Sequence, residues 1–162
     1  MTTTGRTVDV HDIPRIRHRE AMAITAVENT RLNDTLAGLE DGDWTRPTDC
    51  TAWDIRSLVV HLIASAQAQA SPVEFLRQLR AGRPLTAQIG GSHWVDGLNE
   101  AQLRARAHLA TAALPALWNT ASAAALAARS RMLAPTAAAG RSPGDRPGLE
   151  ADRLPVRHRL HP

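Results

Sequence analysis

His61 is the residue of this sequence with the clearest potential for chemistry. It falls at the edge of the apolar stripe of a predicted helix, about 60° from Leu58 and on the line that holds Asp54 and Ser65. At such an edge an imidazole can point into a crevice between helices while its own helix packs against the core. Imidazole is the commonest transition-metal ligand near neutral pH. His61 is therefore a candidate metal ligand, and the alternatives are a histidine half-buried for packing or one solvated beside Asp54.

Other reactive side chains have simpler structural interpretations. Cys50 precedes a predicted helix start and has no visible base partner, so it is interpreted as structural rather than as a reactive thiol. His93 and Asp96 could form an acid–base pair, but a helix-capping role is favoured for Asp96. Trp44 and Trp53 are expected to pack a loop onto the helices. Three further histidines sit among polar neighbours and are expected at the surface: His11, His18 and His108.

Gly and Pro residues separate segments that have helical periodicity, and no segment reads as a strand. The first helix is expected over about residues 16–39. The second is expected to start with Thr51 as its N-cap, with a carboxylate three residues later, as in a capping-box variant. The third opens at Pro72 and runs to about Arg80, or re-caps a kinked continuation of the second, and Gly82 closes it.

Two more helices are expected in the second half of the chain. One begins at Ser92 or Asp96. The next is expected to begin with Thr111 as its cap and to end near Met132, because Pro115 then lies in a first turn, where its missing N–H costs little. The alternative is one longer helix that Pro115 interrupts.

Composition divides the chain into three parts. Residues 1–14 are expected to be a flexible N-terminus, and residues 15–133 a helical domain. The last 29 residues, 134–162, contain 5 Pro, 3 Gly, 5 Arg and 5 Ala and keep no apolar period. A segment of that kind buries too little to offset its ordering entropy, so a disordered tail is predicted there.

The charge balance argues against nucleic-acid binding. The pI near 10.8 arises because the sequence has no lysine and all 19 of its basic residues are arginine, while the net charge is only +3. No basic stripe occurs, and a chain with no tyrosine and one phenylalanine offers little for base stacking. The chain also lacks an apolar run of membrane-spanning length or a secretory h-region, so no membrane partner and a cytoplasmic location are expected.

The run DWTRPTDCTAWDIRSLVVHL, residues 43–62, resembles the mycothiol-dependent maleylpyruvate isomerase family, within the wider DinB-like four-helix bundles. The family pattern has a tryptophan, a threonine, a Pro-Gly-Trp turn, and then an arginine, an aspartate and a histidine on the helix. Thr51-Ala52 replaces the usual Pro-Gly, and Ser57 replaces the usual aspartate. Residues 94–99 also resemble the family's third helix, within a similarity that spans roughly residues 17–132. Five residues match in order and spacing: Trp44, Thr48, Trp53, Arg56 and His61.

The resemblance implies an all-α, DinB-like up-and-down bundle with two cofactors, a divalent metal, usually zinc, and mycothiol. It makes His61 a metal ligand, since the family's ligand histidine lies on helix two. A catalytic zinc needs three protein ligands, and the family takes the others from a later helix, as a carboxylate or histidine followed four residues on by a histidine. No such pair follows residue 92 on a credible helix. His158 and His161 are three apart in Arg/Pro-rich sequence and are interpreted as a chance pair.

These observations predict an incomplete bundle, with about three main helices plus short ones, that has lost its ligand-bearing fourth helix by truncation or frameshift. Two functions remain open. In the first, the protein is a mycothiol-dependent isomerase or thiol-transferase of a small molecule, and the metal-activated thiolate adds to an activated alkene, as for maleylpyruvate. In the second, it is a non-catalytic bundle without a complete metal site, which self-associates, for instance as a homodimer, through the uncovered face.

Overall fold

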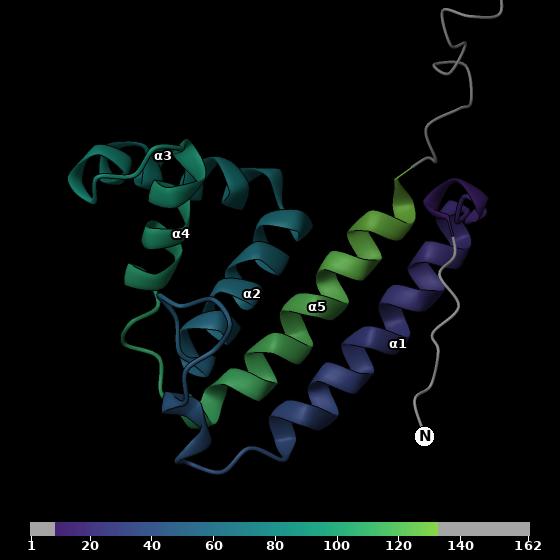
Figure 1. Cartoon of the computed structure of the whole chain (residues 1–162), viewed down its shortest axis with the longest axis horizontal. Helices are drawn as coiled ribbons and strands as arrows, with labels where there is room; N and C mark the ends of the chain where they lie inside the picture. The colour runs from purple at the N-terminus through teal and green to yellow at the C-terminus, as the bar shows by residue number, and fades with distance from the viewer. Residues whose placement is uncertain (1–8, 133–162) are drawn as a thin grey trace, which may run out of the picture. The chain divides into compact units, whose positions relative to one another are not determined.

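The computed structural model describes residues 9–132. This range contains five α-helices, drawn in Figure 1: α1 (His18–Ala37), α2 (Ile55–Ala70), α3 (Pro72–Gln88), α4 (Trp94–Arg104) and α5 (Leu114–Arg131). It also contains three 3-10 turns: η1 (Val10–Asp12), η2 (Asp43–Thr45) and η3 (Thr111–Ala113). The described residues form no strand, so the all-α prediction is confirmed. Residues 1–8 and 133–162, with most of the expected flexible N-terminus and the whole expected tail, lie outside the described range.

Three helices form the main core. In Figure 1, α5 runs between α1 and α2, and it contacts both. The apolar stripe of α2 buries Val60 and Ile63 against Leu114 and Trp118 of α5, and α1 contributes Leu36. Burying an aliphatic side chain of this size contributes about 1.5–3 kcal/mol, so each of these contacts adds to the stability of the unit. The all-α bundle is confirmed for residues 9–132, but α3 is not one of the short helices expected beside three main ones, because with 17 residues it is longer than α2 with 16.

The remaining two helices, α3 and α4, pack against each other through glycine. A Cβ on Gly82 would lie 2.6 Å from Cα of Leu98, and a Cβ on Gly97 would collide with the carbonyl oxygen of Gly82. The predicted helix end at Gly82 is therefore wrong. Gly82 lies in the middle of α3, where the absence of a side chain lets the two backbones touch, and α3 continues through Pro84 to Gln88.

The predicted N-cap of α2 is also wrong. Thr51 lies in a turn before the helix, and Asp54 is the capping residue, with Oδ1 accepting a hydrogen bond of 2.7 Å from the backbone N–H of Ser57. Burial raises the pKa of Asp54, but the hydrogen bonds from Ser57 outweigh it and leave the pKa below its ordinary value. An ionised carboxylate at this end also complements the helix dipole.

The starts of α4 and α5 follow the predicted chemistry in part. His93 and Asp96 form a reciprocal capping box at the start of α4, which confirms the capping role of Asp96. Pro115 lies in the first turn of α5, as expected. Thr111 makes no side-chain capping bond and instead begins η3. None of the described helices is long and apolar enough to cross a membrane.

Candidate functional site around His61

His61 lies half-buried on α2, in contact with residues from two other segments. Its Nδ1 is hydrogen-bonded to Oε1 of Gln102 on α4, at 2.8 Å. Its ring packs against the indole of Trp53, with 4.8 Å between centroids and a tilt of 41°. Within the described residues Nε2 makes no hydrogen bond. The imidazole is therefore held on one edge and one face, and Nε2 has no hydrogen-bond partner among residues 9–132.

The other motif residues build the scaffold that holds this ring. Thr48 Oγ1 donates to the carbonyl of Trp53 at 2.9 Å and accepts from the N–H of Cys50 at 3.2 Å, which closes the turn before α2. Trp44 is buried in the main core, and Trp53 contacts His61, so both tryptophans pack this segment as expected. The segment before α2 is therefore held by the burial of Trp44 at one end and by the contact between Trp53 and His61 at the other.

Arg56 has a structural role that its motif position did not reveal. Its guanidinium donates to the carbonyl oxygens of Ala107 and Leu109, at 3.0 and 2.8 Å. These two residues belong to the connection between α4 and η3, so Arg56 fastens that connection to α2. The contact also fixes the end of α4, the helix that presents Gln102 to His61.

A polar network extends from Gln102 into α3. Gln102 Nε2 donates to Oε1 of Gln78 at 2.8 Å, and Gln78 Nε2 donates to Glu74 at 2.8 Å. Gln78 and Gln102 are each only 2% exposed. Glu74 in turn accepts two hydrogen bonds of 2.7 Å from Arg77 and one of 3.2 Å from Arg106. His61 is therefore connected through two buried amides to an ion-pair cluster near the surface.

Two guanidinium groups share the single carboxylate of Glu74. Hydrogen bonding from Arg77 is the main cause that lowers the pKa of Glu74 from 4.5 to about 2, and Gln78 and Arg106 add to it against the effect of burial. Burial lowers the pKa of Arg106 from its usual high value, although Glu74 opposes the shift. Arg106 also donates to Gln67 of α2 at 2.5 Å. Glu74 is thus an anion throughout the neutral range.

The described residues do not make a metal centre by themselves. Between residues 9 and 132 no group of three or more His, Cys, Asp or Glu side chains lies close enough to share an ion. A catalytic zinc takes three protein ligands, and His61 supplies one. The neighbours of the ring, Gln102 and Trp53, are an amide and an indole, which suit orientation of the imidazole better than ligation of zinc.

The other predicted candidates lie apart from His61. The side chain of Cys50, interpreted as structural, is exposed, and the part of Cys50 in the turn before α2 is taken by its backbone N–H. His93 caps α4, which confirms the structural interpretation over an acid–base pair. His11 and His108 are exposed as expected, whereas His18 is half-buried. His158 and His161 lie outside the described residues.

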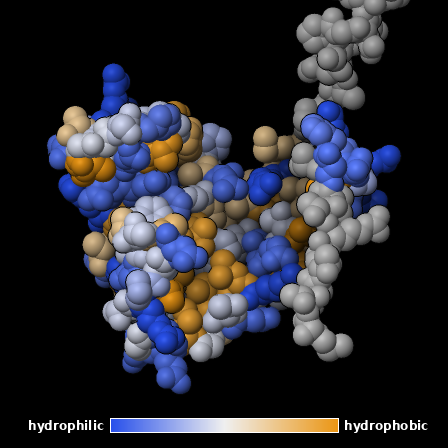
Figure 2. All heavy atoms as spheres, in the orientation of Figure 1, coloured by the Kyte–Doolittle hydropathy of each residue, from blue (hydrophilic) through white to orange (hydrophobic). Residues whose placement is uncertain are grey.

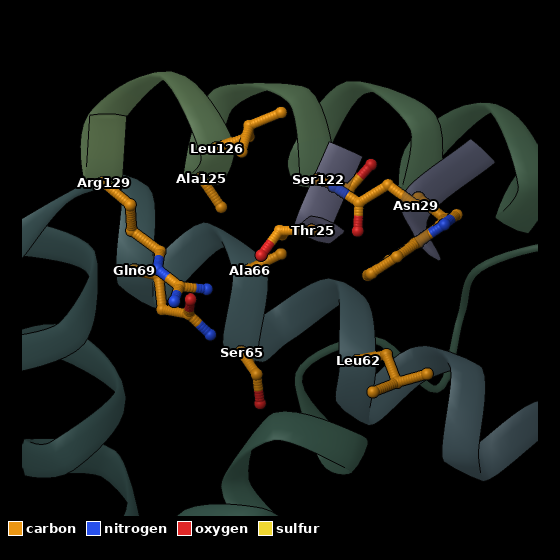
Figure 3. Close-up of a pocket in the computed structure, with 11 residues that line it drawn as sticks. Thr25, Asn29, Leu62, Ser65, Ala66, Gln69, Ser122, Ala125, Leu126 and Arg129 are labelled. Atoms are coloured by element: carbon orange, nitrogen blue, oxygen red, sulfur yellow. The ribbon is translucent and has the colours of Figure 1, made fainter. Parts of the chain in front are cut away.

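A groove opens on another side of α2, between α1, α2 and α5. Its volume is about 150 Å³. Figure 3 shows the residues that line it, among them Leu126 and Arg129 of α5 and Ser65 and Gln69 of α2. Apolar side chains also gather in the hollowed centre of the face shown in Figure 2, between hydrophilic margins. Among residues 9–132, part of the α1, α2 and α5 surface is therefore a groove that no other described element fills.

Gln78, Gln102 and Arg106 were missed by sequence reasoning. A weak signal exists for Gln102, which lies four residues after Leu98 and so on the buried face of α4. A polar side chain within an apolar stripe needs a hydrogen-bond partner. Gln78 likewise lies four residues before the packing residue Gly82. The identity of their partners depends on the contact between α3 and α4, which the sequence pattern does not show.

Comparison with known families gives one match. The family model of the mycothiol maleylpyruvate isomerase N-terminal domain matches residues 25–161. The matched range includes the segment around His61 and continues past residue 133. No curated protein and no solved structure matches the chain.

Proposed function

Because the chain belongs to the mycothiol maleylpyruvate isomerase family, we propose that it is a divalent-metal-binding, mycothiol-dependent isomerase or thiol-transferase with His61 as one metal ligand. The family resemblance favours zinc as the metal and a small molecule as the substrate. One observation supports His61 above the other histidines: its Nδ1 is bound to a buried amide, and Nε2 has no partner among residues 9–132. A second contact that orients a ligand histidine is typical of metal sites.

The proposal requires further ligands from outside the described residues, because residues 9–132 contain no group of three or more His, Cys, Asp or Glu side chains that could hold an ion. The full chain is therefore the material to test. Metal content is measured on the purified full chain and on His61→Ala, with His108→Ala as the matched control, since the side chain of His108 is exposed and takes no part in the hydrogen bonds that join His61 to Gln102 and Gln78. Zinc bound near one equivalent in the wild type and in His108→Ala, but absent from His61→Ala, is the expected result. A metal-free wild type whose melting temperature does not respond to added zinc refutes it.

A second candidate function is a non-catalytic bundle that self-associates as a homodimer. The groove that residues 9–132 form between α1, α2 and α5 favours it, because a groove with apolar side chains at a protein surface can serve as a contact surface. Leu126→Glu places a charge in this groove, and Ala127→Glu places the same charge on an exposed position beside it. Light scattering should then show a dimer in the wild type and in Ala127→Glu, and a monomer in Leu126→Glu. A monomeric wild type at all concentrations removes this candidate.

A further inference from the structure

The hydrogen bonds that join His61 to Glu74 run in one direction. The carboxylate of Glu74 and the backbone carbonyl of Ala64 can accept hydrogen bonds but cannot donate them. The side-chain amide of Gln78 faces both of them, at 2.8 Å from Oε1 of Glu74 and 3.0 Å from the oxygen of Ala64. The atom of Gln78 that faces them must therefore be the NH2 group, because the opposite orientation would bring oxygen against oxygen twice.

This choice determines the next amide. With its nitrogen committed to Glu74 and Ala64, Gln78 presents Oε1 to Gln102, at 2.8 Å. Gln102 must then donate to Gln78 through Nε2, and its own Oε1 is left facing His61. An amide oxygen only accepts. Nδ1 of His61, 2.8 Å away, must therefore be the donor and carry a proton.

The fold keeps these four side chains in register. Gln78 and Gln102 are both 2% exposed, so no bulk water competes for their hydrogen bonds. The close backbone contact of Gly82 with α4 brings the two helices together at this level. Arg77 and Arg106 hold Glu74 from the other side, so the terminal acceptor is fixed in position as well as in charge.

We propose that Glu74, Gln78 and Gln102 are positioning residues that hold the neutral imidazole of His61 as the Nδ1–H tautomer, with the lone pair on Nε2. In that tautomer Nε2 is the atom that can bind a cation or accept a proton, and it is the atom without a partner among residues 9–132. The link to metal binding rests on the proposed function, whereas the tautomer is a property of the metal-free chain. The competing view is that the two glutamines only satisfy each other in the interior and leave His61 free to hold either tautomer.

The tautomer can be measured directly on the EDTA-treated full chain. Two-bond ¹H–¹⁵N correlation spectra separate a protonated ring nitrogen from an unprotonated one, and they are recorded at about pH 9, well above the ordinary pKa of an imidazole. The His61→Ala spectrum assigns the signals. In the wild type, Nδ1 of His61 is expected to be the protonated nitrogen and Nε2 the unprotonated one. A wild-type spectrum dominated by the Nε2–H pattern overturns the inference.

Two variants test the role of the relay, the chain of hydrogen bonds that runs from His61 through Gln102 and Gln78 to Glu74. Gln102→Met has nearly the same length but no amide, so His61 should change to a mixture with a large Nε2–H component. Gln69→Met is the matched control, because Gln69 is an exposed glutamine on the same helix as His61 and lies outside the relay. It should leave the spectrum of His61 unchanged. An unaltered Nδ1–H pattern in folded Gln102→Met would show that the relay does not set the tautomer.

The outcomes separate this inference from the proposed function. A chain with the Nδ1–H tautomer that binds no zinc supports the relay and refutes the metal site. A chain that binds zinc through His61 but shows the Nε2–H pattern when metal-free does the reverse. If Gln102→Met fails to fold, the wild-type spectrum still decides the tautomer. Glu74→Gln then replaces Gln102→Met as the test of the relay, because it changes the far end of the relay, where the side chain reaches solvent. Glu74→Gln should weaken the preference for Nδ1–H, and an unchanged preference counts against the relay.

Discussion

Replacing Gly82 by alanine perturbs the contact that brings the two halves of the polar network together. The new Cβ would lie 2.6 Å from Cα and 2.7 Å from the backbone nitrogen of Leu98, and 2.9 Å from the carbonyl carbon of Gly97. Ordinary van der Waals contacts lie between 3.4 and 4 Å. All three atoms belong to the backbone of α4, so no side-chain rotation can relieve the overlap. The helices have to separate by about 1 Å, which is the difference between these distances.

The expected cost combines terms of opposite sign. Alanine is better than glycine inside a helix by about 1 kcal/mol. Overpacking a close contact costs about 1–3 kcal/mol. The separation also stretches the 2.8 Å bond between Gln78 and Gln102, and a buried amide that loses its partner costs about 1–3 kcal/mol. At mid-range these terms sum to a net loss of about 3 kcal/mol in the free energy of unfolding, although helix propensity alone predicts a gain.

Urea unfolding followed by far-UV circular dichroism measures this difference. Gly42→Ala is the control, because a Cβ on Gly42 would meet nothing within 4 Å and its φ of −70° suits alanine. This control should stay within about 0.5 kcal/mol of the wild type. If Gly82→Ala unfolds at the same or a higher urea concentration than the wild type, the helices do not touch at Gly82 and the argument for the positions of Gln78 and Gln102 fails.

Two further predictions concern the residues around the site. The pKa of Glu74 falls from 4.5 to about 2 on folding, so its contribution to stability is complete above pH 4.5 and disappears as the pH falls toward 2. Because Arg77 is largely exposed and solvent screens its interaction with Glu74, this contribution to the free energy of unfolding is on the order of 1–2 kcal/mol. Thermal melts at a series of pH values should show less acid destabilisation in Glu74→Gln, and identical pH profiles would contradict the assignment. Arg56→Met removes both hydrogen bonds to the α4–η3 connection, so urea unfolding should show a free energy of unfolding that is lower by about 1–3 kcal/mol. Arg31→Met breaks only an exposed ion pair and should change the free energy of unfolding little.

The sequence predicted helices well where one strong signal was present. In α2 the apolar stripe locates the helix although the predicted N-cap was wrong, and in α5 Pro115 indicates the first turn. The prediction failed at Gly82, because a glycine that ends a helix and one that permits a close helix contact look the same in a single sequence. The difference lies in Gly97 and Leu98, which are distant in the chain and adjacent in space.

The candidate site was also predicted only in part, since the sequence indicated His61 but not its hydrogen-bond partner. His61 could be selected because the motif and the edge of the stripe both point to it. Its partner Gln102 could not, because an amide gains its role from the groups it meets. Sequence reasoning considered Asp54 as a neighbour of His61 in solvent, but Asp54 caps α2 and His61 bonds to α4 instead. A local contact was expected where a long-range contact formed.

The chemistry of the relay explains why its interior members are amides. A buried carboxylate beside His61 would cost several kcal/mol in lost hydration, whereas an amide with both ends hydrogen-bonded is buried at little cost. A pair of leucines would fill the same space but would leave Nδ1 of His61 without a partner and its tautomer unspecified. An amide has a donor end and an acceptor end, so each glutamine passes on the direction that it receives. The charge of Glu74 can then stay beside Arg77 and Arg106 near the surface, while its preference for donors determines which nitrogen of a ring on another helix carries the proton.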